Sequence, residues 1–190
     1  LIAEGRASAP IVFTSAASRP EPGDWIGIEI RAHALPSTHF SHTTVEFAGA
    51  SRGMPGEPPA AIRSWMETGL PISNVRLIAS AGYGIAMLDA AGFAPGATAL
   101  VVEGSRGDGA VYFADVDRVR TLPLGRYAGN TRDEITLAAT QRVVRNESTW
   151  SALGAGQRYN VRRAARIMVN GVEAPRLILA PGTVVAFDED

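Results

Sequence analysis

The sequence predicts a single all-β domain in which short strands stack on one another as a solenoid. Three observations lead to this expectation: turn-forming residues at short intervals, short runs of β-branched and aromatic residues, and a turn motif that recurs along the chain. The 190 residues include 20 Gly and 12 Pro, so uninterrupted amphipathic helices have little room. A chain of this length can bury a sizeable core on its own.

The expected strands are short runs in which inward apolar residues alternate with outward polar ones. Residues 28–30 (IEI) and 45–47 (VEF) have this period of two, which is typical of a half-buried strand. Helical signals are few by comparison. In chain order, the expected strands are 10–14, 26–30, 43–47, 75–78, 99–103, 110–113, 134–137, 167–169 and 177–179.

Repetition favours a solenoid over a sandwich of two sheets. A Pro-Gly turn recurs at residues 22–23, 55–56, 95–96 and 181–182, and each copy leads to or from a strand-like run. Imperfect repeats of roughly 20 to 30 residues, none able to bury its apolar face alone, are typical of a stacked array. A sandwich also has short strands between turns, and it stays the alternative because the repeats are loosely spaced.

Four stretches resemble the right-handed parallel β-helix repeat proteins, a family of bacterial secreted or surface-anchored proteins. They are 9–15 (APIVFTS), 22–28 (PGDWIGI), 42–49 (HTTVEFAG) and 180–187 (APGTVVAF). The resemblance extends over nearly the whole chain, includes no catalytic motif, and implies a right-handed parallel β-helix. Residues 114–166 fit the repeat poorly. We expect them to form an irregular insertion, the least regular part of one domain spanning 1–190.

The order of these stretches predicts end-to-end association. In the proteins that the chain resembles, a Pro-Gly-Thr rung precedes a Pro-Ile-x-Phe-Thr-Ser rung, whereas here the first lies at 181–183 and the second at 10–15. We therefore expect either a slice of a longer array or copies that stack head to tail through unpaired strand edges. Such stacking would bury Ile2, Ile11, Leu179 and Phe187.

Composition limits both the chemistry and the partners. The chain has no Cys and no Lys, which excludes thiol catalysis, cysteine zinc sites and Schiff-base chemistry. A formal net charge of -1 gives no strong field to attract nucleic acid. No apolar run approaches the length of a membrane span. Together with the resemblance, this predicts an extracellular or cell-surface protein that has no cofactor, unless it binds Ca²⁺.

Four residues are candidates for binding a polysaccharide. Glu29 and Glu46 lie in strand-like runs and could line one face of successive rungs, and Trp65 and Trp150 are expected to be exposed enough to stack on sugar rings. Carboxylates at a fixed separation are what glycoside chemistry needs. The simpler interpretation is that these are solvent-facing positions, which require a polar residue in any case.

Two aspartates are candidates for binding a metal ion. Asp115 and Asp117 alternate onto one side of an extended segment and could supply oxygen ligands to Ca²⁺. The simpler interpretation is a pair of solvated loop carboxylates. No nucleophile motif of the Gly-x-Ser-x-Gly type occurs, so no residue is assigned a catalytic role.

The leading functional expectation is a non-enzymatic β-solenoid module that acts as a scaffold, an adhesin or a head-to-tail filament building block. The alternative is a polysaccharide-active enzyme of the lyase or glycosidase type, or a carbohydrate-binding module, using a groove on one solenoid face. An enzyme should bring two carboxylates, or a carboxylate and an Arg, within about 5–10 Å in a groove.

The solenoid also predicts which residues are buried and where the rungs break. Pro58 and Pro59 should interrupt the strands, because proline cannot donate to a central ladder. Residues 114–166 should contain most of any helix. The residues expected to be largely buried are Ile11, Phe13, Ile28, Ile30, Val45, Phe47, Leu77, Val101, Val111, Ile178 and Val185.

Overall fold

The computed structural model describes residues 1–54, 57–141, 143–162, 166–172 and 174–188. Within them nearly all regular structure is strand, and the one helix is the short 3-10 helix η1 (Val116–Thr121), which falls in the region expected to contain most of any helix. The expected all-β class is confirmed. No helix in the described ranges has the length and apolar composition needed to cross a membrane.

Two long sheets contain most of the strands of the described chain. In the first sheet, β1 (Ile2–Glu4) and β2 (Ile11–Phe13) both pair with β4 (His39–Glu46), and the order continues through β6 (Ile72–Ile78), β8 (Thr98–Glu103) and β10 (Gly125–Arg126). The second sheet has the order β3 (Ile28–Ile30), β5 (Ala60–Ser64), β7 (Tyr83–Met87), β9 (Val111–Asp115), β11 (Glu134–Gln141), β14 (Arg158–Val161) and β17 (Val185–Phe187).

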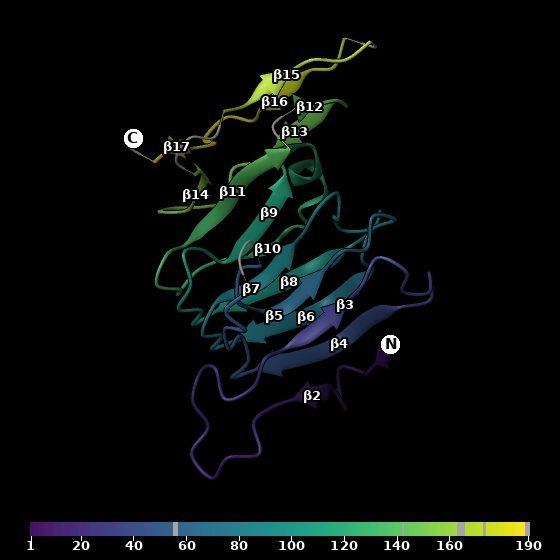
Figure 1. Cartoon of the computed structure of the whole chain (residues 1–190), viewed down its shortest axis with the longest axis vertical. Helices are drawn as coiled ribbons and strands as arrows, with labels where there is room; N and C mark the ends of the chain where they lie inside the picture. The colour runs from purple at the N-terminus through teal and green to yellow at the C-terminus, as the bar shows by residue number, and fades with distance from the viewer. Residues whose placement is uncertain (55–56, 142, 163–165, 173, 189–190) are drawn as a thin grey trace.

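The chain changes sheet after every strand from β3 to β11. All the paired strands are parallel. The chain can therefore return to a sheet only through a crossover connection. Between β3 and β11, each crossover connection contains one strand of the other sheet. Figure 1 shows the result as a stack of strands along the long axis, with the first strands at the lower end and the last at the upper end.

Side chains at the same register position stack through successive strands of the second sheet. The inward-facing partners, in order, are Ile28, Ile62, Ile85, Val111, Ile135, Tyr159 and Val185. The members in the middle of this row are fully buried, and the two at its ends are half-buried. Each side chain in the middle of the row is therefore covered by the strand on either side, as expected for stacked repeats.

The burial predictions hold best in the middle of the stack. Ile30, Val45, Leu77 and Val111 are buried as predicted. The structure leaves Ile11, Phe13, Ile28, Phe47, Val101 and Val185 half-buried. The first and last strands have a neighbour on one side only, which accounts for the end members.

The prediction for Ile178 is wrong, because this side chain is 40% exposed. Ile178 is the central residue of an edge strand, and its register partner is the exposed Thr149. The period of two places Ile178 on the face of Thr149, and Leu177 and Leu179 on the face of Ser148 and Trp150. Because β16 is an edge strand, Leu179 is exposed as well, at 50%. The sequence motif LIL does not reveal which of its residues points inward.

The regular ladder is interrupted in two places. The described part of 51–59 contains no strand, and β5 begins directly after Pro59, as the two prolines require. Farther along, the first sheet ends at β10. The later described strands that lie outside the second sheet form two separate pairs. These are β12 (Val143–Val144) with β15 (Met168–Val169), and β13 (Ser148–Trp150) with β16 (Leu177–Leu179).

Candidate functional site

A cluster of charged residues on the outer face of the second sheet is the candidate site, and Glu29 is at its centre. Glu29 on β3 and Arg63 on β5 are register partners, and their inward neighbours are the stacked isoleucines. Alternation along each strand therefore points both charged side chains away from the core. The site is positioned by strand pairing between residues far apart in the chain.

Three arginines surround the Glu29 carboxylate. Arg31 Nη2 lies 2.6 Å from Oε2, and Arg52 Nη1 and Arg63 Nη2 lie 2.7 Å and 3.0 Å from Oε1. Burial acts to raise the pKa of Glu29, but the hydrogen bonds from Arg52 and Arg31 and the charges of Arg63 and Arg31 outweigh it and lower the pKa. Glu29 is therefore held ionised, which suits charge pairing and not proton transfer near neutral pH.

Arg63 is the most deeply buried charge in the cluster. Its side chain is 1% exposed, and Nε and Nη1 have no hydrogen-bond partner among the described residues. Its contact with Glu29 is an ion pair without hydrogen-bond geometry. Since an isolated buried charge is costly, Glu29 is the counter-charge on which Arg63 depends.

Trp65 joins the same cluster through Arg31. The Arg31 guanidinium carbon lies 4.0 Å from the centroid of the Trp65 ring, a cation–π geometry. The predicted residues Glu29 and Trp65 are thus brought together by Arg31, which contacts both of them. The indole face is occupied by Arg31, which leaves less of it to stack on a sugar.

The other two predicted polysaccharide residues lie elsewhere. Glu46 is on β4 in the first sheet and accepts a hydrogen bond from Thr14 Oγ1 at 2.8 Å, so Glu29 and Glu46 do not line one face. Trp150 is 1% exposed, and its ring centroid lies 4.9 Å from that of Tyr159. The expectation of an exposed platform at Trp150 is wrong, because β13 turns this residue inward.

Asp115 and Asp117 hold local backbone in place. Asp115 Oδ1 accepts a hydrogen bond from the N–H of Asp117 (3.0 Å) and caps η1. Asp117 accepts hydrogen bonds from the N–H groups of Arg145 (2.8 Å) and Asn146 (3.0 Å), and from Asn146 Nδ2 (2.6 Å). No group of three or more His, Asp or Glu that could hold a metal ion occurs in the ranges that the structure describes.

The role of Asp117 predicts how stability changes with pH. Burial acts to raise the pKa of Asp117, but hydrogen bonds from Arg145 and Asn146 and the charge of Arg120 lower it below the ordinary 3.8. Stability from this carboxylate is present above the unfolded-state pKa and is lost as pH falls through the lower folded-state pKa. We expect Asp117→Asn to lower the free energy of unfolding by about 2 kcal/mol at neutral pH.

Urea denaturation across the acid range tests this expectation. The difference between wild type and Asp117→Asn should shrink below about pH 4. The control is Asp89→Asn, an exposed position that should change stability by less than about 0.5 kcal/mol. A difference between wild type and Asp117→Asn that is constant across this range would contradict the assignment.

Sequence analysis missed Arg52 and Arg63. Arg63 lies in β5, whose sequence AAIRS has no polar–apolar alternation, so no strand was expected there. Arg52 follows β4 in a segment without strand structure, and its approach to Glu29 depends on the path of that segment. The sequence contains one signal for this site: Arg63 interrupts a largely apolar run just before Trp65.

Comparison with protein-family models, with curated proteins and with solved structures finds no match to this chain. Function is therefore inferred from the geometry of the chain's own residues.

Proposed function

We propose that the chain is a non-enzymatic module, a right-handed parallel β-helix that serves as an extracellular or cell-surface scaffold and stacks head to tail with further copies. Alternation between two parallel sheets, with matching side chains stacked at each register position, supports the β-helix. The pairing of Glu29 with three arginines, and the structural roles of Asp115 and Asp117, favour a scaffold over an enzyme.

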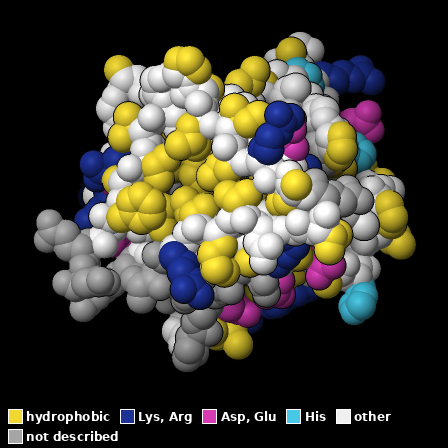
Figure 2. All heavy atoms as spheres, turned by 90° about the horizontal axis from the view of Figure 1, so that it is seen from above, with side chains coloured by type: hydrophobic (Ala, Val, Ile, Leu, Met, Phe, Trp, Pro, Cys, Tyr) yellow, Lys and Arg dark blue, Asp and Glu magenta, His cyan; other side chains and the backbone are white. Residues whose placement is uncertain are grey.

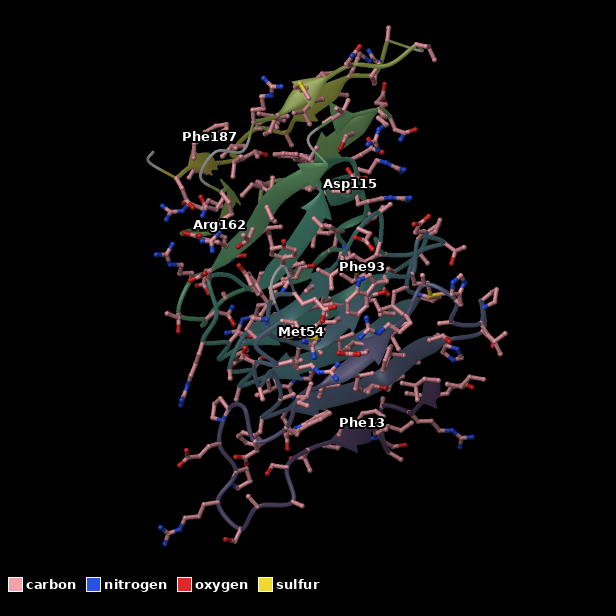
Figure 3. The ribbon with its side chains drawn as sticks, viewed as in Figure 1. Phe13, Met54, Phe93, Asp115, Arg162 and Phe187 are labelled. Atoms are coloured by element: carbon pink, nitrogen blue, oxygen red, sulfur yellow. The ribbon has the colours of Figure 1, made fainter. Side chains whose placement is uncertain are left out.

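The observation that carries the proposal is that apolar side chains are exposed at both ends of the stack. Figure 3 places Phe13 at the lower end and Phe187 at the upper end. Figure 2 looks down on the upper end and shows hydrophobic side chains gathered over its middle. The exposed large hydrophobic residues include Leu1, Ile2 and Val12 near the start of the chain, and Val169, Val172, Ile178, Leu179, Val184 and Phe187 near its end.

The strands at both ends are paired on one side only in the described chain. At the lower end these are β1 and β2 in the first sheet and β3 in the second. At the upper end they include β16 and β17. Unpaired N–H and C=O groups along such an edge readily pair with another strand, and large exposed apolar patches are typical of interaction surfaces.

The two ends carry strands of equal length, because β2 and β16 each have three residues. If β2 of one copy pairs with β16 of the next, the motifs IVF and LIL meet with Ile11 on Leu177, Val12 on Ile178 and Phe13 on Leu179. Every one of these pairs is apolar on both sides. A contact between different surfaces of identical copies does not close on itself, so its product is an open filament.

In the second sheet, β3 would pair with β17 in the same arrangement. Ile28 would then cover Val185, Ile30 would cover Phe187, and both inward rows would continue across the junction. The predicted residues Leu179 and Phe187 would contribute to this interface from the upper end of one copy, and Ile2 and Ile11 from the lower end of the next.

Sedimentation over a range of concentrations tests the stack. The mean mass should rise with concentration through successive multiples of the monomer, and Leu179→Glu or Phe187→Glu should return the protein to a monomer. The control is Leu124→Glu. Leu124 is 81% exposed, directly precedes β10 and lies away from both ends of the stack. A monomer at the highest soluble concentration, or an equal loss of association in the control, would refute the proposal.

A further inference from the structure

Three adjoining cavities form a groove along one side of the stack, where connections from the second sheet enter the first. The largest, about 550 Å³, lies between 93–97 and 118–124. A cavity of about 250 Å³ shares Pro95, Gly96 and Ala97 with it. A third, of about 310 Å³, shares Arg120, Leu122, Pro123 and Leu124. The groove therefore crosses several successive rungs, which suits an extended ligand.

The groove is positively charged. None of the described residues lining the three cavities is an Asp or a Glu, whereas Arg118 and Arg120 both line the largest one. Arg118 forms no ion pair with any residue that the structure describes. Arg120 Nε lies 4.0 Å from Asp117 Oδ2, and that carboxylate is already bound by Asn146. Arg118 thus has no carboxylate partner in the described part of the chain, whereas Arg120 lines the cavity and retains a long ion pair with Asp117.

Hydrogen bonds fix the wall of the groove that carries the arginines. Thr121 Oγ1 donates to the Arg118 carbonyl (2.6 Å) and accepts from the N–H of Phe93 (3.0 Å), which ties η1 to the neighbouring rung. The Tyr127 hydroxyl donates to the Pro123 carbonyl (2.5 Å). A site whose backbone is already held in position loses little conformational entropy when a ligand binds.

Glycine allows the two connections to approach closely. A Cβ atom at Gly92 would lie 2.8 Å from Thr121 Oγ1 and 3.4 Å from the Arg118 Cβ and Cδ. The Arg118 stem therefore packs against the Gly92 backbone, beside the cavity that this residue lines.

We propose that this groove binds a linear acidic polysaccharide, with Arg118 and Arg120 pairing with carboxylates of successive uronate residues. Guanidinium groups bind carboxylates through charge-assisted, often bidentate, hydrogen bonds. Leu124, which is 81% exposed and lines two of the cavities, contacts the less polar faces of the sugar rings. This binding function is separate from the head-to-tail stacking, because the groove lies on the side of the stack.

The lining favours a polysaccharide over other linear anions. Single-stranded nucleic acid is bound by stacking its bases on exposed aromatic rings. The aromatic residues that line the described groove, Phe40, Phe93, Tyr127 and Tyr159, are at most 2% exposed. An acidic peptide is recognised partly through pockets for alternate side chains, whereas the central wall is built from Ala94, Gly96 and Ala97.

Titration calorimetry with hexagalacturonate tests the proposal, with cellohexaose as the uncharged sugar and hexaglutamate as the acidic peptide. We expect hexagalacturonate to bind, the binding to weaken with added salt, and both comparison ligands to bind at least about tenfold more weakly. Arg118→Gln and Arg120→Gln should each reduce affinity for hexagalacturonate by about tenfold.

The matched control is Arg106→Gln, which removes an exposed arginine that lines none of the three cavities. Its affinity should equal that of the wild type. Circular dichroism of each variant confirms that the fold is retained. Absence of binding to hexagalacturonate, an equal loss in Arg106→Gln, or binding of hexaglutamate as tight as that of the sugar would overturn the proposal.

Discussion

Replacing Glu29 with Gln should lower the free energy of unfolding by about 3 kcal/mol, because the buried Arg63 loses its counter-charge. Arg63 is 1% exposed, and Glu29 Oε1, at 3.0 Å, supplies its only ion pair with a described residue. Gln retains the shape of Glu29 and removes its charge. Urea denaturation at neutral pH measures the difference.

Two further variants show whether the loss comes from the unpaired charge. Adding Arg63→Met to Glu29→Gln removes the buried cation and should recover most of the stability, since apolar replacement of a buried ion pair is often neutral or favourable. Glu103→Gln breaks the exposed pair with Arg126 (2.9 Å) and should cost less than about 1 kcal/mol. A loss in Glu29→Gln no larger than in Glu103→Gln would show that Arg63 does not depend on Glu29.

Replacing Phe113 with Ala should lower the free energy of unfolding by about 4 kcal/mol. Phe113 is fully buried, and its register partners on the neighbouring strands are Met87 and Leu137. Its ring also meets that of Phe93 edge to face, with centroids 6.1 Å apart. Because Phe113 lies between two neighbouring strands of the second sheet, truncation leaves a cavity that neither neighbour can readily fill.

The matched control for this core substitution is Phe187→Ala. Phe187 occupies the same inward row of the second sheet, on its last strand, and is 60% exposed. At concentrations low enough to keep the protein monomeric, its truncation should cost less than about 1 kcal/mol. Equal losses at both positions would show that burial between rungs does not determine the contribution of this row.

The sequence predicted those strands whose two faces differ in polarity. The expected strands 43–47, 75–78 and 99–103 match β4 (which ends at Glu46), β6 and β8. In these strands buried Val45, Leu77 and Val102 alternate with more exposed neighbours. In the first sheet the outer face is solvated, so the period of two is present in the sequence.

β5 and β7 were missed because both of their faces are covered. Every residue of AAIRS and YGIAM is buried, so no alternation of polarity identifies them as strands. Gly84 also weakens the β signal in β7. It is required there because a Cβ would lie 2.3 Å from Val102 Cγ1 on the facing sheet. Such a packing requirement cannot be seen in an isolated sequence.

Candidate residues could be chosen by chemical type, but their grouping depended on register. Glu29 and Trp65 were identified as polar or aromatic residues of strand-like segments. Their connection through Arg31, and the partnership of Glu29 with Arg63, follow from the pairing of β3 with β5. Trp150 was misplaced because the direction of an indole depends on which residues of a three-residue strand point inward.

The division of the first sheet has a mechanical consequence. Above β10 the described chain pairs as separate two-stranded sheets, whereas the second sheet continues without a break through β14 to β17. Within the described chain, the upper strands are therefore joined to the lower ones by a hydrogen-bonded ladder on one side only. Bending about that side opens the gap between β10 and β13, which already contains a cavity, without breaking a ladder hydrogen bond. On the side of the first sheet, the hydrogen bonds of Asp117 with Arg145 and Asn146 take the place of a ladder, so we expect the stack to bend more readily across the first sheet than along the second.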